Sequence, residues 1–158
     1  MQALKGSLVA LVTPLAANGS VDYAALKDLV GWHIEEGTDG IVSVGTTGEA
    51  PTLSPKEHAG VITKTIEYVN GAIPVIAGTG GNSTHESIAL TKEAADAGAD
   101  FCLLVTPYYN KPNQEGLLNH FIAIADSVDI PQILYNVPSR TACDILPSTV
   151  KTLAKHQN

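Results

Sequence analysis

Apolar segments recur along this chain at regular intervals, separated by segments with a different, helical periodicity. Five short runs are rich in β-branched and other apolar residues: 8–12, 40–44, 73–77, 101–105 and 130–135. Their starts lie roughly 30 residues apart, which is the usual length of one strand, one helix and two loops. Because the runs lack a clean alternation of polar and apolar residues, they are typical of parallel strands buried on both faces.

The segments between these runs predict helices at 23–35, 55–70, 84–97, 115–127 and 146–155. Ser83 offers a hydroxyl cap to the third helix, and an acidic residue follows three positions later. Pro55 suits the first turn of the second helix. We expect Ile88, Ala89 and Ala95 to form the apolar face of the third helix.

Five strand–helix units over residues 1–158 predict a single α/β domain, and two architectures fit it. Five units complete a doubly wound open sheet, whereas eight units of this size give the roughly 250 residues of a (β/α)8 barrel. The length favours the open sheet. The final stretch, LPSTVKTLAKHQN, closes a helix where a further strand would be expected, and it favours the barrel.

Composition and charge narrow the range of possible functions. The chain is 44% hydrophobic and its net charge is −7, so it has a globular core and is unsuited to nucleic acid or anionic membranes. We expect a cytoplasmic protein, because no cleavable signal and no bilayer-spanning run is evident. Cys102 and Cys143 lack metal-ligand spacing and are expected to be reduced thiols. The five histidines fall in helical segments, so neither a metal nor a cofactor site is predicted.

Small and polar residues gather directly after each predicted strand. They form the stretches VTP (12–14), GTTGEAPT (45–52), GTGGNST (78–84), TPYYNKP (106–112) and YNVPSRT (135–141). Because the carboxyl ends of parallel strands share one edge of a sheet, these five loops are expected to converge. The pattern therefore predicts a binding site at that edge.

The first glycine-rich loop has two interpretations. Gly45 and Gly48 would let backbone N–H groups and the hydroxyls of Thr46 and Thr47 approach a small anion, but an ordinary tight turn explains them equally well. Glu49 is expected to accept backbone hydrogen bonds rather than to act as a base. The stretch GTGGNS lacks the last glycine of a dinucleotide-binding loop and favours an ordinary turn.

Three phenols and one guanidinium carry the most distinctive chemistry. Tyr108 and Tyr109 follow the fourth predicted strand, and Tyr135 follows the fifth. Hydrogen-bonded phenols can relay protons. Arg140 is the only arginine beside eight lysines, and its planar fork binds a carboxylate through two hydrogen bonds.

The motifs GTTGE (45–49), TPYYNKP (106–112) and YNVPSRT (135–141), in this order on successive strand ends, resemble the 4-hydroxy-tetrahydrodipicolinate synthase (dihydrodipicolinate synthase) family of pyruvate-dependent class I aldolases. GSLVALVTP (6–14) and IPVIAGTG (73–80) extend the resemblance over essentially the whole chain. Arg140 together with TPYYN distinguishes this family from N-acetylneuraminate lyase and keto-deoxy-sugar aldolases. The resemblance implies a (β/α)8 TIM barrel, of which this chain would hold the amino-terminal five βα units.

The resemblance also implies an activity, that of a lyase in lysine and diaminopimelate biosynthesis. It condenses pyruvate with L-aspartate 4-semialdehyde through a Schiff base on a lysine at the end of the sixth strand. That strand would begin after Asn158. We therefore expect this chain alone to lack the nucleophile, to be inactive, and to expose an unpaired strand edge and apolar surface.

Roles for individual residues follow from the resemblance. Thr46 and Thr47 would hold the carboxylate of pyruvate. Thr46, Tyr135 and Tyr109 would form a proton relay, with Tyr109 reaching across a tight dimer interface into the site of a neighbouring subunit. Arg140 would bind the carboxylate of the semialdehyde, and no cofactor is implied.

Lysine inhibits many members of this family at the dimer interface of a homotetramer, a dimer of dimers. The corresponding positions are Pro51, His58, Asn82, Glu86 and Tyr108, whereas Ala50 and Pro55 lack side-chain hydrogen bonds that some sensitive members have. Two alternatives remain beside the synthase. One is another pyruvate-dependent aldolase such as N-acetylneuraminate lyase, and the other is a non-catalytic half-barrel that binds small carboxylates.

Overall fold

The computed structural model describes residues 4–158, so the first three residues of the predicted domain lie outside the described part. Its strands are β1 (Leu8–Ala10), β2 (Gly40–Ser43), β3 (Val75–Gly78), β4 (Phe101–Val105) and β5 (Gln132–Tyr135). Its α-helices are α1 (Tyr23–Glu35), α2 (Pro55–Val69), α3 (Thr84–Asp96), α4 (Gln114–Ser127), α5 (Pro138–Thr141) and α6 (Pro147–Leu153), and residues Ala50–Thr52 form a 3-10 turn. Every predicted strand and helix is present, whereas the single turn α5 was not predicted.

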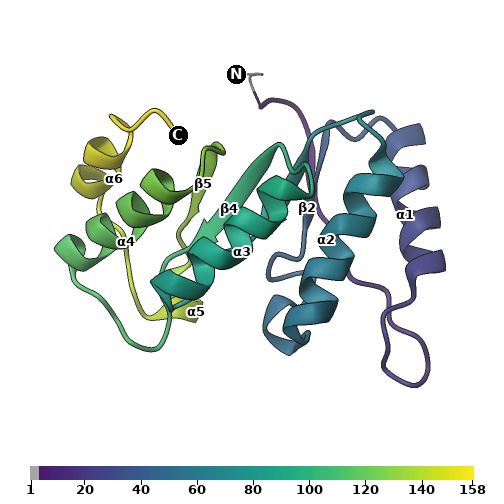
Figure 1. The fold of residues 1–158 in the computed structure, drawn as a ribbon, viewed down its shortest axis with the longest axis horizontal. Coiled ribbons are helices and arrows are strands. Elements are labelled where there is room, and N and C mark those ends of the chain that lie inside the picture. Colours follow the sequence, from purple (N-terminus) through teal and green to yellow (C-terminus); the bar gives the residue numbers. More distant parts are fainter. Residues whose placement is uncertain (1–3) are drawn as a thin grey trace.

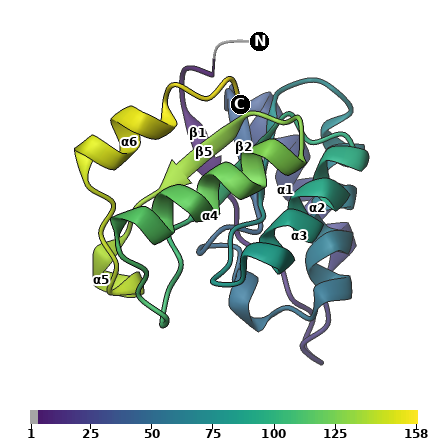
Figure 2. The same ribbon diagram turned by 60° about the vertical axis from the view of Figure 1, so that its left-hand side comes forward.

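The order of the strands decides between the two predicted architectures. All neighbouring pairs are parallel, and the spatial order β1-β2-β3-β4-β5 follows the order of the chain. A doubly wound open sheet reverses its strand order at a switch point, and this sheet does not. The sheet instead curls into a half-barrel with its helices on the outside (Figures 1 and 2). The barrel prediction is confirmed, and the preference for an open sheet on grounds of length was wrong.

The helix-covered face of the sheet carries the hydrophobic core, which has two parts. One lies between β2, β3 and the helices α1 and α2, and it contains fully buried Leu26, Val30 and Ile41. The other lies between β4 and α4, and it contains Leu104 and Phe121, which are 0% and 1% exposed. Fully burying such side chains stabilises a fold by about 1.5–3 kcal/mol each.

Polar caps start the four long helices. Ser54 and Glu57 form a reciprocal capping box at the start of α2, and Ser83 accepts the N–H of Glu86 at the start of α3. Asp22 and Asn113 cap α1 and α4 through their side-chain oxygens. Each cap satisfies a backbone N–H that has no partner within its helix. The predicted cap at Ser83 is therefore confirmed.

Helix α3 packs partly through hydroxyl groups rather than through an apolar face alone. Thr91 is fully buried, and its Oγ1 lies 2.8 Å from Oγ1 of Thr79, which follows β3. Ile88 and Ala95 pack against the second core, as predicted. Ala89 is exposed, so its assignment to the apolar face was wrong. Hydroxyls that pair with each other replaced apolar residues on the face that meets the sheet.

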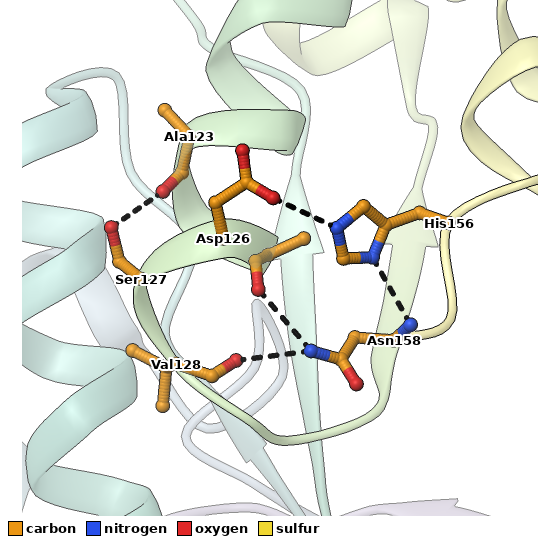
Figure 3. A network of polar contacts seen from close by, with 7 residues as sticks. Ala123, Asp126, Ser127, Val128, His156 and Asn158 are labelled. Carbon is orange, nitrogen blue, oxygen red and sulfur yellow. Dashed lines mark hydrogen bonds and ion pairs between the residues drawn. The ribbon is translucent and has the colours of Figure 1, made fainter.

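The last residues of the chain return to the end of α4 (Figure 3). His156 accepts the N–H of Asn158 at Nδ1, and its Nε2 lies 3.0 Å from Oδ1 of Asp126. The side-chain amide of Asn158 donates to the carbonyls of Ala125 and Val128. Because Nδ1 accepts a hydrogen bond, the proton of His156 lies on Nε2 and is donated to Asp126. These contacts fix the segment after α6 on α4.

The two edges of the sheet are unpaired within residues 4–158. Strands β1 and β5 each have one neighbour. On the inner side of the curl, the side chains of Leu8 and Val12 are 36% and 51% exposed. Exposed apolar residues beside an open strand edge are uncommon in stable monomers. The expected open edge and apolar surface are therefore confirmed.

Candidate functional site

A cavity of about 470 Å³ lies at the carboxyl ends of β2, β3, β4 and β5. Short α5 lies at this end of the molecule, away from the carboxyl terminus of the chain (Figures 1 and 2). The residues predicted from sequence that line the cavity are Thr46, Pro51, His58, Glu86, Tyr108, Tyr135 and Arg140. Four of the five loops expected to converge thus line one cavity, whereas the loop VTP (12–14) does not line it and contacts the loop after β2 through Thr13.

The loop after β2 is tightly folded and presents free hydroxyls. Backbone hydrogen bonds close its turn, and Thr13 Oγ1, from the segment after β1, donates to the carbonyl of Gly48 at 2.7 Å. Gly48 is closely packed, because a Cβ there would lie 3.0 Å from the Cα of Val44 and 3.1 Å from the carbonyl oxygen of Leu11. Thr46 and Thr47 are exposed, and their hydroxyls form no hydrogen bond within residues 4–158. Only Thr46 lines the cavity.

Glu49 stabilises this loop through its backbone. The backbone of Glu49 adopts a left-handed conformation with φ 60°, and its carbonyl accepts hydrogen bonds from the N–H and hydroxyl of Thr52. The carboxylate is exposed and takes no hydrogen bond from any described residue. The expectation that the carboxylate ties the loop together was therefore wrong, because the carbonyl already does so.

The glycines at the end of β3 permit close packing rather than phosphate binding. A Cβ on Gly78 would lie 2.1 Å from the carbonyl oxygen of Val44, and one on Gly80 would lie 2.3 Å from the amide nitrogen of Val105. Such distances are possible only for glycine. The two residues therefore allow β3 to pass closely between the ends of β2 and β4. This agrees with the ordinary turn expected for GTGGNS.

His58 joins helix α2 to the end of β3. It is 8% exposed, and its Nε2 lies 2.7 Å from the carbonyl oxygen of Gly78, so Nε2 carries the proton. Burial lowers the pKa of His58, although its bond to the Gly78 carbonyl and the charge of Glu93 act in the opposite direction. The ring is therefore a neutral donor at neutral pH, on the wall of the cavity.

The two neighbouring tyrosines after β4 point in different directions. Tyr108 lines the cavity and is 38% exposed. Tyr109 has a left-handed backbone with φ 71° and is 90% exposed, so it lies outside this cavity. Asn110 ties their loop to the loop after β3 by donating to the carbonyl of Asn82 at 3.0 Å. Asn82 itself does not line the cavity.

The end of β5 places Tyr135 and Arg140 on the opposite wall. Tyr135 pairs with Val105 of β4, and its carbonyl accepts the N–H of Thr106 at 3.0 Å. The turn α5 then brings Arg140 to the cavity. Within residues 4–158, no carboxylate lies within ion-pair distance of its guanidinium. The fork of Arg140 is therefore available to an external anion.

The charge of the cavity favours a carboxylate ligand near Arg140. Arg140 is the only lysine or arginine among its lining residues, and Glu86 is the only carboxylate. No described lysine lines the cavity. The arrangement can bind a carboxylate and move protons through hydroxyls, but the part of the chain that the structure describes offers it no amine.

Two residues at this end of the sheet were not predicted from the sequence. Thr13 fastens the loop after β2, and Thr141 lines the cavity beside Arg140 with 3% of its surface exposed. Both lie inside stretches that the sequence marks as polar strand ends. Their hydroxyls did not stand out, because threonine is common in strands and turns.

Residues 4–158 lack metal-ligand clusters, membrane-spanning helices and reactive thiols. No cluster of three or more potential metal-ligating side chains occurs there, and no described helix is long and apolar enough to cross a membrane. Cys102 and Cys143 are free thiols, as predicted, and both are buried. Burial raises the pKa of the Cys102 thiol to about 12, so it remains protonated at neutral pH.

Comparison with known proteins agrees with this geometry. The family model described as the dihydrodipicolinate synthetase family matches residues 3–158. The 4-hydroxy-tetrahydrodipicolinate synthase of Alcanivorax borkumensis is 61% identical over 155 residues, which cover 98% of this chain and 53% of that relative. The chain thus spans about half the length of the curated relatives that it matches.

Solved structures show the same relationship. The chloride-inhibited dihydrodipicolinate synthase of Acinetobacter baumannii in complex with pyruvate superposes with a TM-score of 0.98 at 58% identity, covering 99% of this chain and 54% of that one. The lysine-bound enzyme of Cyanidioschyzon merolae superposes with a TM-score of 0.92 at 43% identity, covering 94% and 51%. From its sequence, its strand order and these matches, the chain belongs to the dihydrodipicolinate synthetase family.

Proposed function

We propose that these residues build the substrate-binding wall of a 4-hydroxy-tetrahydrodipicolinate synthase, a lyase that condenses pyruvate with L-aspartate 4-semialdehyde. The observation that carries the proposal is the single cavity in which Thr46, from the end of β2, meets Tyr135 and Arg140, from the end of β5. The relatives that are 61% identical to this chain are named as synthases, which favours this activity over that of N-acetylneuraminate lyase.

The chemistry requires an amine, hydroxyls and an anion site. An amine attacks the keto carbon of pyruvate and water leaves, which forms a Schiff base. Loss of a methyl proton then gives an enamine, whose carbon attacks the aldehyde carbon of the second substrate. We assign the amine to a lysine from polypeptide outside these 158 residues, because no described lysine lines the cavity.

The described residues would bind the substrates and transfer protons during the reaction. Thr46 and Thr47 hold the carboxylate of pyruvate through hydroxyls that are free in this structure. Tyr135 donates and accepts the proton at the Schiff-base step, and Thr46 connects it to Tyr109 of a neighbouring subunit. The 90% exposure of Tyr109 supports a role outside its own cavity. This role requires at least a dimer, and we propose a tight dimer that pairs into a dimer of dimers, in the cytoplasm.

Arg140 would select the second substrate. Its guanidinium forms two parallel hydrogen bonds with the carboxylate of the semialdehyde, and these fix the distance between the aldehyde carbon and the enamine. The absence of a described carboxylate partner supports this assignment. A lysine at this position would keep the charge but lose the fork.

A feedback site for lysine adjoins the same cavity in our proposal. Four of its proposed residues also line the cavity: Pro51, His58, Glu86 and Tyr108. The fifth, Asn82, lies in the adjacent loop. The carboxylate of Glu86 suits an amino group, and the phenol of Tyr108 suits a carboxylate. The lysine-bound relative supports regulation of this kind. Titrating the active protein with lysine tests it, and unchanged activity at millimolar lysine rejects it.

The test of the synthase activity uses the complete gene product that carries these residues. We expect condensation of pyruvate with L-aspartate 4-semialdehyde and no cleavage of N-acetylneuraminate. Arg140→Gln should lower kcat/KM for the semialdehyde on the order of a hundredfold, and Arg140→Lys should lower it less. Cleavage of the sugar acid, or full activity of Arg140→Gln, would reject the proposal.

A further inference from the structure

The turn that carries Arg140 is held at its base by two amide side chains, those of Asn136 and Gln114. Asn136 donates from Nδ2 to Oδ1 of Asp144 at 2.7 Å, and its Oδ1 accepts the N–H of Ile145 at 3.2 Å. Gln114 from α4 supports the same segment, since it donates to the carbonyl of Asp144 and accepts the N–H of Leu146. The loop from 136 to 145 is therefore closed at its base, with Arg140 between the closing contacts.

A second set of contacts centres on the hydroxyl of Thr141. Its Oγ1 lies 2.8 Å from the carbonyl oxygen of Cys143 and accepts the N–H of the same residue at 3.3 Å. It also lies 3.3 Å from Oγ1 of Thr106, which donates to it from the end of β4. The carbonyl oxygen of Val137, one turn earlier, also lies 3.2 Å from this Oγ1, so its one proton is shared between two carbonyls, while the N–H of Cys143 and the hydroxyl of Thr106 occupy its two lone pairs. The hydroxyl therefore has nothing left to offer a ligand.

The turn depends on these contacts because it has little stability of its own. Helix α5 is four residues long and has no side-chain cap at its start. Its end is at Ala142, which adopts a left-handed conformation with φ 53°, unfavourable for any residue with a Cβ. The hydroxyl of Thr141 bridges across Ala142 to Cys143 and outward to Thr106. It thus connects the turn of Arg140 to the neighbouring strand of the sheet.

We propose that Thr141 is a positioning residue, which holds the turn of Arg140 against the end of β4 so that the guanidinium faces the cavity. The inference rests on the proposed function, in which Arg140 binds the carboxylate of the second substrate. A guanidinium forms two hydrogen bonds with a carboxylate only when it is oriented correctly. A small misplacement of a group that positions substrate lowers the reaction rate strongly. Thr141 acts through Arg140 and does not itself contact substrate.

The kinetic test compares Thr141→Val with Thr141→Ser in the complete gene product. Valine keeps the shape of threonine and removes the hydroxyl, whereas serine keeps the hydroxyl. Thr141→Val should raise KM for the semialdehyde by about tenfold or more and leave KM for pyruvate within about twofold. Thr141→Ser should restore most of the loss. An unchanged KM for the semialdehyde, or an equal rise in both KM values, overturns the inference.

A second measurement does not depend on activity. The N–H groups of Arg140, Thr141 and Ala142 donate to carbonyls of Val137 and Pro138. Their hydrogen exchange should accelerate by about tenfold or more in Thr141→Val but not in Thr141→Ser.

The matched control is Thr152→Val, which removes an exposed hydroxyl bonded to the Ser148 carbonyl of α6 and should leave these amides unchanged. Unaltered exchange in Thr141→Val overturns the inference. Absence of condensation in the unsubstituted protein rejects the proposed function alone, and exchange still decides whether Thr141 holds the turn.

Discussion

The two faces of the curled sheet differ sharply in what covers them. On the outer face, helices bury Ile41 and Leu104 completely. On the inner face, Leu8 and Val12 remain exposed, and half-buried Leu103 lines the cavity. Since hydrophobic stabilisation follows the apolar area removed from water, the outer face supplies most of the stability of this chain. The inner face, where the cavity lies, contributes less to this stability.

Two adjacent leucines of β4 test this difference most strongly. Leu104→Ala should reduce the free energy of unfolding by about 2–5 kcal/mol, because it leaves a cavity among fully buried neighbours. Leu103→Ala, one residue away on the open face, should cost about 1 kcal/mol. Urea unfolding of the two variants measures both values. Equal costs would show that the faces contribute alike.

Gly78 sharpens the comparison, because it lies on the open face but has no free space. Gly78→Ala should destabilise the chain by about 1–3 kcal/mol, since its Cβ would meet the carbonyl oxygen of Val44 at 2.1 Å. Gly81→Ala is the control in the same loop, where the nearest atom would be Ser87 Oγ at 3.5 Å. Thermal melting should separate the two variants. A stable Gly78→Ala protein would show that β2 and β3 can move apart freely.

His58 connects the outer helix layer to the inner cavity and predicts a smaller, pH-dependent effect. Burial lowers its pKa in the folded state below 6.5, so the unfolded chain binds the proton more readily. This contribution to stability is complete above pH 6.5 and is lost as the pH falls through the folded pKa. Urea midpoints from pH 7.5 to 5.5 should fall less in His58→Gln than in the unsubstituted chain. The control is His85→Gln at an exposed position, and identical slopes for His58→Gln and the unsubstituted chain would contradict the account.

The smallest effect is expected on the outer layer, far from the cavity. Gly31 lies inside α1, and a Cβ there would meet no atom within 4 Å. Gly31→Ala should stabilise the chain by about 0.5–1 kcal/mol through helix propensity. Gly37 has equally open surroundings but a φ of +80°, so Gly37→Ala should destabilise. Calorimetry that ranks the two in the opposite order would reject this reasoning.

The fold was predictable to the extent that local patterns express it. Buried strands, the cap at Ser83 and the first-turn proline Pro55 leave clear signals, and the elements they define are present. The choice between barrel and open sheet was not available from periodicity, because it depends on strand order. Ala89 shows a further limit of predicting buried helix faces from apolar periodicity. The face of α3 that meets the sheet contains hydroxyl-bearing residues, which a search for apolar positions does not detect.

The candidate site was predictable where residue chemistry is distinctive. Arg140 and Tyr135 stood out by type and by their place after a strand, and one cavity contains both. Thr13 and Thr141 were missed, because their importance lies in partners that are distant along the chain, Gly48 and Thr106. Long-range hydrogen bonds of common residues leave no signal in a single sequence.

The central claim is that these residues supply binding groups for a Schiff-base reaction but not its amine. The most direct measurement is to treat the 158-residue chain and the complete gene product with pyruvate and borohydride, followed by intact-mass analysis and peptide mapping. The account predicts a reduced pyruvyl adduct in the active protein on a lysine outside residues 1–158, and none on the eight lysines within them. A stable adduct on any of those eight lysines would contradict it.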